Sequence, residues 1–183
     1  MAQMRERIFA GFGALLFLGS ACALTVFVLL QPSSSSDVAS NAQKAAQSAS
    51  QKCTDNKTEP TLPVPDIYKA SGKVTALQKT DLTVGTGPAA KNGDCLVVKY
   101  YGTLASNGTK FDEDFTDTTA LAFVLGSGQV ITGWDQGVVG MKAGGVRRLV
   151  IPAAQAYGSQ AVGSIPANSD LVFVVKLLRI QKL

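Results

Sequence analysis

Hydrophobic positions fall into two regions of the chain, and a polar segment separates them. The first region is an uncharged run over residues 8–30, with Arg5 and Arg7 directly before it. A run of this length can span a bilayer as one helix. Basic residues on its short N-terminal flank favour a cytoplasmic location for that end, so residues 1–30 are predicted to be a signal-anchor.

Other interpretations of this run stay open. Small residues at 20–23 could form a signal-peptide cleavage site, which would make the protein secreted, although the apolar run continues to Leu30. Acylation of Cys22 would give a lipoprotein, but Gly19 fits poorly where that processing site takes a larger aliphatic residue. A buried core helix is the remaining alternative. Every interpretation except the last places the rest of the chain outside the cytoplasm, in the periplasm or at the cell surface.

Residues 31–72 form the polar segment between the two regions. They are rich in Ser, Ala, Gln, Lys and Asn, and Pro60, Pro63 and Pro65 lie near the end. Such a composition buries too little apolar surface to offset the entropy that is lost on ordering. The segment is therefore predicted to be a flexible, disordered linker.

From residue 73 onward the pattern changes to short β-branched and aromatic runs, which are typical of strands. Asn107-Gly108 is a strong hairpin signal. Residues 132–141 form the only run that favours a helix. Strands are expected at residues 74–77, 82–84, 95–102, 109–111, 121–125, 147–151 and 171–180. The pattern predicts one α+β domain over residues 73–183, in which a curved antiparallel β-sheet wraps around one short helix.

Charge and cysteine content narrow the class of function. The net charge is +4, but the lysines are scattered and form no basic stripe interleaved with aromatic residues, so nucleic acid is not an expected partner. The three cysteines include no Cys-x-x-Cys pair, which argues against a zinc site. Cys53 and Cys95 could form a disulfide in an oxidising compartment, and the sequence leaves that pairing open.

Missing residue types exclude several kinds of catalysis. The chain has no histidine, which excludes Ser-His-Asp triads, Cys-His pairs and histidine-based metal sites. It also has no phosphate-binding glycine loop. Asp112, Glu113, Asp114 and Asp117 are clustered, but they lack the glycine and terminal glutamate of an EF-hand and are expected to form a solvated loop. No metal or cofactor is expected.

What remains is an aromatic and apolar motif. Trp134 is the only tryptophan and follows Val130-Ile131-Thr132-Gly133. Further along come a Gly144-Gly145 turn, Tyr157-Gly158, Ile165-Pro166 and Leu171-Val172-Phe173. This arrangement closely resembles the FKBP family of peptidyl-prolyl cis-trans isomerases, over residues 83–183.

The resemblance implies a proline-binding pocket and a role for each matching residue. Trp134 would form the floor, which requires its indole to be open to the exterior. The N–H of Ile131 and the hydroxyl of Tyr157 would hold substrate carbonyl oxygens, and Asp112 would lie at the rim. The remaining lining positions are Tyr100, Phe111, Leu121, Val130, Ile165 and Phe173. Leu121 stands where many family members have an aromatic residue, and Ala167 replaces a common second proline.

The implied function is rotation about X–Pro bonds in extracytoplasmic folding clients, by a monomer that macrolide immunosuppressants would inhibit. An apolar pocket would act without covalent chemistry, because it favours the twisted amide over the planar, more charge-separated one. Two alternatives stay open. The same pocket could bind proline-containing segments without catalysis, or the aromatic residues could all be structural core.

Overall fold

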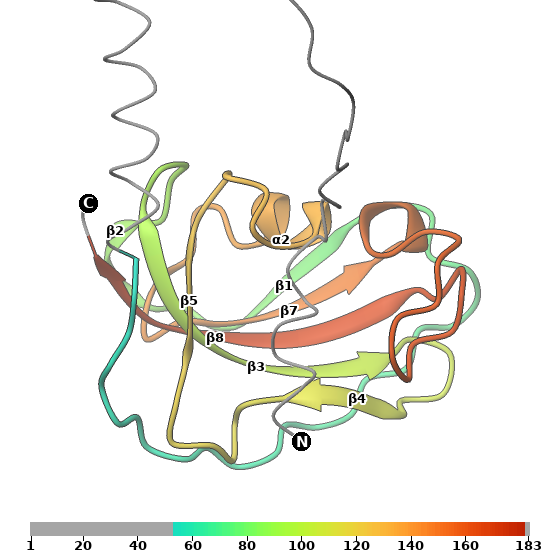
Figure 1. Cartoon of the computed structure of the whole chain (residues 1–183), viewed down its shortest axis with the longest axis horizontal. Helices are drawn as coiled ribbons and strands as arrows, with labels where there is room; N and C mark the ends of the chain where they lie inside the picture. The colour runs from blue at the N-terminus through green and yellow to red at the C-terminus, as the bar shows by residue number, and fades with distance from the viewer. Residues whose placement is uncertain (1–52, 182–183) are drawn as a thin grey trace, which may run out of the picture.

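The computed structural model describes residues 53–181, and its single domain is built on antiparallel strands (Figure 1). The elements in chain order are β1 (Gln78–Thr83), β2 (Thr86–Ala89), β3 (Cys95–Leu104), β4 (Lys110–Glu113), β5 (Leu121–Val124), α2 (Thr132–Gly137), β6 (Lys142–Ala143), β7 (Val146–Ile151), the 3-10 turn η2 (Ala153–Gln155) and β8 (Leu171–Gln181). The predicted α+β fold, with an antiparallel sheet and one short α-helix, is confirmed for this part of the chain.

The main sheet has the strand order β1-β7-β8-β3-β4, and β5 also pairs with β3. Its two longest strands, β3 and β8, pair along almost their full length, from Cys95 opposite Gln181 to Leu104 opposite Leu171. The strands β2 and β6 form a separate two-stranded sheet. Figure 1 shows the main sheet curving beneath α2, so that the helix covers one face.

Two glycines let α2 approach the sheet closely. A Cβ atom added at Gly133 would lie 2.4 Å from Cγ2 of Ile151, and one added at Gly137 would lie 2.8 Å from Cδ1 of Leu149. Both positions lie on the helix face that meets β7, four residues apart. The two glycines therefore allow the backbone of α2 to lie almost in contact with the side chains of β7. This close approach places Trp134 in the interior.

Two predicted elements differ from the structure. Residues 74–77 form no strand, because the N–H of Val74 donates to the carboxylate of Asp170 and the ladder with β7 begins only at Gln78. The helix ends at Gly137 instead of continuing to residue 141. There the carbonyl of Gly137 accepts a hydrogen bond from the Arg147 guanidinium at 2.9 Å, and Gly140 adopts a positive φ of 82°.

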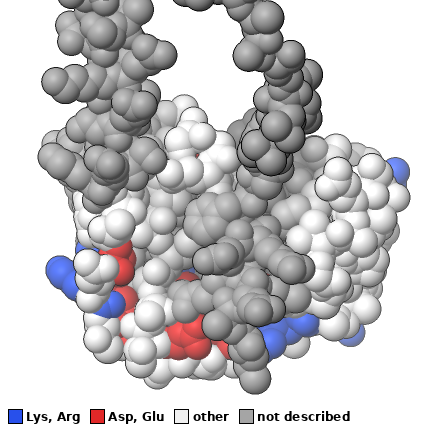
Figure 2. All heavy atoms as spheres, in the orientation of Figure 1, with Lys and Arg blue, Asp and Glu red and all other residues white. Residues whose placement is uncertain are grey.

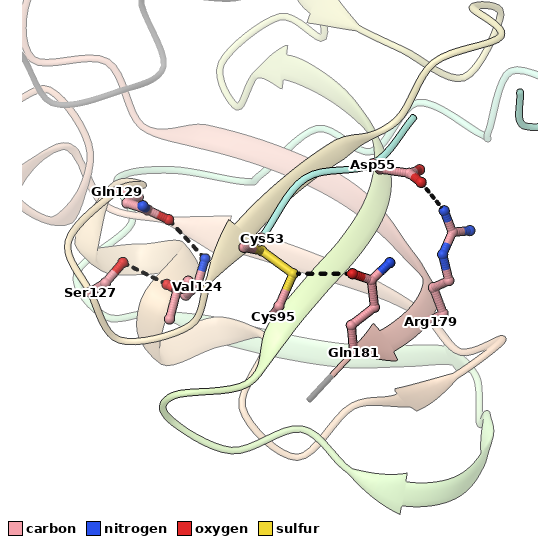
Figure 3. Close-up of a disulfide and its surroundings, with 8 residues drawn as sticks. All are labelled: Cys53, Asp55, Cys95, Val124, Ser127, Gln129, Arg179 and Gln181. Atoms are coloured by element: carbon pink, nitrogen blue, oxygen red, sulfur yellow. Dashed lines mark hydrogen bonds and ion pairs between the residues drawn. A yellow bond between two sulfur atoms is a disulfide. The ribbon is translucent and has the colours of Figure 1, made fainter. Parts of the chain in front are cut away.

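Residues 53–70, which we call the strap, lie against the domain. Cys53 forms a disulfide with Cys95 at the start of β3 (Figure 3), which settles the pairing that the sequence left open. Arg179 of β8 forms ion pairs with Asp55 and Glu59 of the strap. These contacts tie the beginning of the strap to both central strands.

Side chains further along the strap are also packed. Leu62 packs against the buried cluster of Tyr101, Phe115 and Val174. The guanidinium of Arg148 stacks 3.9 Å from the ring centre of Tyr68. Residues 53–70 are therefore packed against the domain, and the flexible linker that was expected over residues 31–72 does not extend through them.

The predicted signal-anchor over residues 1–30, and the rest of the predicted linker up to residue 52, lie outside the described residues. Within residues 53–181, no helix is long and apolar enough to cross a membrane. The face of the molecule drawn in Figure 2 carries both acidic and basic side chains along its lower edge, among mostly uncharged residues.

Candidate active site

The candidate site is built around Trp134 of α2, whose indole is surrounded by rings from three strands. The ring centres of Tyr100 on β3 and Phe173 on β8 lie 5.4 and 5.2 Å from that of the indole, both in edge-to-face geometry. Phe123 on β5 lies 5.8 Å away. Such pairs add stabilisation beyond the area that they bury. The cluster therefore fixes the orientation of the indole.

The indole is fully buried, with 0% of its surface exposed. Its Nε1 has no hydrogen-bond partner within residues 53–181. In this structure Trp134 therefore does not form the open pocket floor that was expected from the sequence. Here the indole is a core residue, and any substrate contact must begin at the margin of the cluster.

All the apolar and aromatic candidates belong to this one cluster. Buried members are Tyr100, Phe111, Val130, Ile131, Trp134, Ile165 and Phe173, and the half-buried Leu121 and Tyr157 pack against them. Residues separated by up to 73 positions are brought together because β3, β4, β5, β8 and α2 converge here. The structure thus assembles the set that the resemblance selected.

Asp112 joins the cluster through polar contacts. Its Oδ2 accepts a hydrogen bond of 2.6 Å from the hydroxyl of Tyr100, and its Oδ1 accepts one of 3.0 Å from the N–H of Glu113. Burial, followed by the negative charge of Asp112, raises the pKa of Tyr157 to about 12. The hydroxyl of Tyr157 therefore stays protonated at neutral pH and can donate a hydrogen bond.

Ile131 supplies a second donor at the start of α2. Its carbonyl accepts hydrogen bonds from the N–H groups of Trp134 and Asp135, at 2.8 and 3.2 Å. No hydrogen bond within residues 53–181 uses the N–H of Ile131 itself. A buried N–H without an acceptor is uncommon and is a natural partner for a ligand carbonyl.

Gly102 contributes to the site and was missed by the sequence analysis. A Cβ atom at this position would lie 2.7 Å from Phe111 and 2.9 Å from Phe173, two rings that meet edge to face at 5.5 Å. Glycine inside a strand often marks such a close approach. Its place in the middle of a β-branched and aromatic run is the signal that could have identified it.

The acidic cluster is also different from expectation. Asp114 is fully buried, and its Oδ1 accepts a hydrogen bond of 2.5 Å from the N–H of Tyr100. Lys99, likewise fully buried, donates to the carbonyl oxygens of Asp114 and Asp117 at 3.2 and 2.6 Å. The prediction of a solvated loop is therefore wrong for Asp114, since this loop is anchored to β3 from inside.

Known proteins share this fold and sequence. The family model for FKBP-type peptidyl-prolyl cis-trans isomerases matches residues 87–178. An FK506-binding protein of Streptomyces anulatus is 46% identical over 119 residues, which make up 63% of this chain and 96% of that protein. A peptidyl-prolyl cis-trans isomerase of Saccharomyces cerevisiae is 52% identical over 115 residues, which are 62% of this chain but only 28% of the relative.

Several fungal relatives are much longer than the matched region: the chain spans 28% of the yeast protein and 21% of FK506-binding protein 4 of Neurospora crassa. Two solved structures superpose with similar quality. AtFKBP13 gives a TM-score of 0.53 at 36% identity, over 57% of this chain and 93% of its own. FkpA from Escherichia coli gives 0.54 at 35% identity, over 80% and 62%. The chain belongs to the FKBP-type peptidyl-prolyl cis-trans isomerase family.

Proposed function

We propose that this protein catalyses cis–trans isomerisation of X–Pro peptide bonds in polypeptides. The main support is that a chain of this family gathers all the apolar candidate site residues into one cluster, with polar groups at its edge. Relatives that carry the name peptidyl-prolyl cis-trans isomerase or FK506-binding protein support the same activity.

Amide resonance sets the barrier for this rotation at about 18–20 kcal/mol. At the twisted midpoint the resonance is lost, and the amide is less charge-separated than the planar form. An apolar environment that excludes water therefore favours the twisted form. Lowering the barrier by about 5–8 kcal/mol would accelerate rotation by about 10⁴ to 10⁶-fold.

We place the reacting bond at the margin of the cluster, where Leu121, Asp112 and Tyr157 remain partly exposed. The hydroxyl of Tyr157 and the N–H of Ile131 donate hydrogen bonds to carbonyl oxygens that flank the proline. Trp134 supports this surface from behind as part of the packed core. Holding both carbonyls in a bent conformation adds binding that is specific to the transition state.

We further propose that the clients are extracytoplasmic and that residues 1–30 anchor the protein in a membrane by a single pass. The Cys53–Cys95 disulfide supports this location, because such bonds persist in oxidising compartments and are rare in the cytosol. Mass spectrometry of the natural N-terminus tests the anchor: an intact residue 1–30 segment is expected, and a chain that begins after residue 23 would show cleavage instead.

The activity is tested with the full chain and a tetrapeptide that contains a Leu-Pro bond, by exchange NMR of the cis and trans proline signals. Acceleration of exchange by catalytic amounts of protein is expected. The matched control is Tyr157→Phe, which removes one proposed donor and should lower kcat/KM by about tenfold. Unchanged exchange with the wild-type protein would overturn the proposal.

The second candidate, a binding module without catalysis, gives a different result in the same experiment. Chemical shifts of the peptide would change on binding while its isomerisation rate stayed constant. FK506 provides an independent probe, since relatives are named for binding it. It is expected to compete with the peptide and to suppress the acceleration.

A further inference from the structure

The segment that joins β4 to β5, residues 114–120, which we call the acidic loop, connects two candidate site residues. Asp112 lies two positions before it, on β4, and Leu121 follows it directly as the first residue of β5. Both side chains are half-buried at the margin of the aromatic cluster. Asp112 pairs with Gly102 and Leu121 pairs with Val98, so the acidic loop joins two residues that β3 also holds in place.

One set of contacts joins the acidic loop to the main sheet. The buried ammonium of Lys99 binds two of its carbonyl oxygens, and the carboxylate of Asp114 accepts from the backbone of β3. The ring of Phe115 is buried and lies 6.2 Å from the ring of Tyr101. These contacts attach one side of the first half of the loop to the sheet.

A second set of contacts comes from the strap. The N–H of Glu59 donates to the carbonyl of Thr118 at 2.7 Å, and the N–H of Leu62 donates to the carbonyl of Phe115 at 2.6 Å. The side chain of Leu62 also packs against the cluster that contains Phe115. The strap therefore runs beside the acidic loop and supplies backbone donors to both of its halves.

The strap has few apolar anchors of its own, since its partly buried hydrophobic residues are Leu62, Tyr68 and Ala70. An extended segment of this kind loses much conformational entropy when it is ordered. The disulfide from Cys53 to Cys95, together with the ion pairs of Arg179, closes its free end onto β3 and β8. Closing the segment covalently lowers that entropic cost.

We propose that the strap is a positioning element of the site. When the Cys53–Cys95 disulfide is closed, the strap fixes the acidic loop, and through it Asp112 and Leu121. When the disulfide is reduced, the strap detaches, the loop loosens, and catalytic efficiency and selectivity between peptides change. This inference rests on the proposed isomerase function for its kinetic part, whereas the ordering of the loop can be measured without any activity.

The test compares the oxidised full chain with Cys53→Ser and with Leu62→Ala, which keeps the disulfide. Tyr68→Ala is the matched control, because it weakens the strap at its contact with Arg148, away from the acidic loop. Amide hydrogen exchange is followed at Asp114 and Asp117. The N–H of Asp114 donates to the carbonyl of Tyr100, and the N–H of Asp117 donates to the carbonyl of Asp114. Both test variants should exchange about tenfold faster there, and the control should not.

The kinetic readout is the ratio of kcat/KM for two peptides that carry Leu or Ala before proline. Partial unfolding would lower both values equally and leave the ratio unchanged. A displaced Leu121 should change the ratio by about threefold in both test variants and in the reduced wild-type protein. The reoxidised protein should regain the original ratio.

Unchanged exchange at Asp114 and Asp117 in both test variants would overturn the proposal. An effect of the same size in Tyr68→Ala would also overturn it, because the strap would then act only through general stability. If the wild-type protein fails to accelerate isomerisation, the proposed function fails. The exchange experiment then still decides whether the strap orders the loop.

Discussion

The hydroxyl of Tyr100 on β3 donates a 2.6 Å hydrogen bond to Oδ2 of Asp112 on β4. The same tyrosine ring contacts Trp134 edge to face, so one side chain connects the aromatic core to the carboxylate at its margin. A hydrogen bond to a carboxylate is stronger than a neutral one. The orientation of Asp112 therefore depends on the hydroxyl group of a core residue.

Tyr100→Phe removes this hydroxyl and keeps the ring. We expect the free energy of unfolding to fall by about 1–2 kcal/mol, because a partly buried carboxylate loses a donor. Isomerisation should slow at the same time. Urea unfolding and the exchange assay measure the two effects. Tyr101→Phe is the control, since neighbouring strand residues face opposite sides of the sheet; equal effects in both variants would contradict the prediction.

Tyr157 gives a prediction for alkaline pH. Burial and Asp112 raise its pKa from 10.0 to about 12, so the folded protein keeps this proton at a pH where the unfolded chain has lost it. Its contribution to stability is complete below about pH 10 and is lost as the pH rises from about 10 to 12. The loss should be about 2 kcal/mol, allowing for the partial exposure of the ring.

Urea titrations of the wild-type protein and Tyr157→Phe across this pH range isolate the effect, because other tyrosines and lysines titrate in both proteins. The difference between the two should shrink as the pH rises. A difference that stays constant between about pH 9 and 12 would show that the tyrosine is not perturbed in this way.

Trp134→Ala tests whether the indole is core. Complete burial among three rings predicts a loss of about 3–5 kcal/mol in the free energy of unfolding, as for other large-to-small core substitutions. Trp134→Phe should lose less, because it refills part of the space. Thermal unfolding followed by circular dichroism measures both. A nearly unchanged melting temperature for Trp134→Ala would mean that the indole lines an open cleft instead.

Gly133→Ala reverses the usual helix rule. Alanine in a helix is normally favoured over glycine by about 1 kcal/mol. Here the new methyl group would meet Ile151 at 2.4 Å, so we expect a net destabilisation of about 1–3 kcal/mol. Thr132→Ala, at an exposed position of the same helix, is the control and should change stability by less than about 0.5 kcal/mol.

The regular part of the fold was predictable because its signals are local. Asn107-Gly108 predicted the hairpin between β3 and β4, and Gly108 adopts the expected positive φ of 78°. The helix start at Thr132 was also confirmed. The helix end was not predicted, because Arg147, a residue of β7, binds the carbonyl oxygens there.

The strap and the buried lysine were not predictable, because their signals are not periodic. Single side chains such as Leu62 and Tyr68 anchor the strap to partners far along the chain. Lys99 alternates correctly for a strand face that normally meets solvent, and only the fold of residues 114–117 encloses it. The family resemblance selected the candidate site residues, but their sequence positions gave no information on how deeply Trp134 is buried.

The position of the disulfide has a mechanical consequence. Cys53 is the first described residue, and its sulfur is bonded to the start of β3, beside Gln181 at the end of β8 (Figure 3). A pull that arrives through the preceding residues passes by way of the sulfur atoms into the longest paired strands of the sheet. The disulfide bridges the segment between residues 54 and 94, so the tension bypasses that segment.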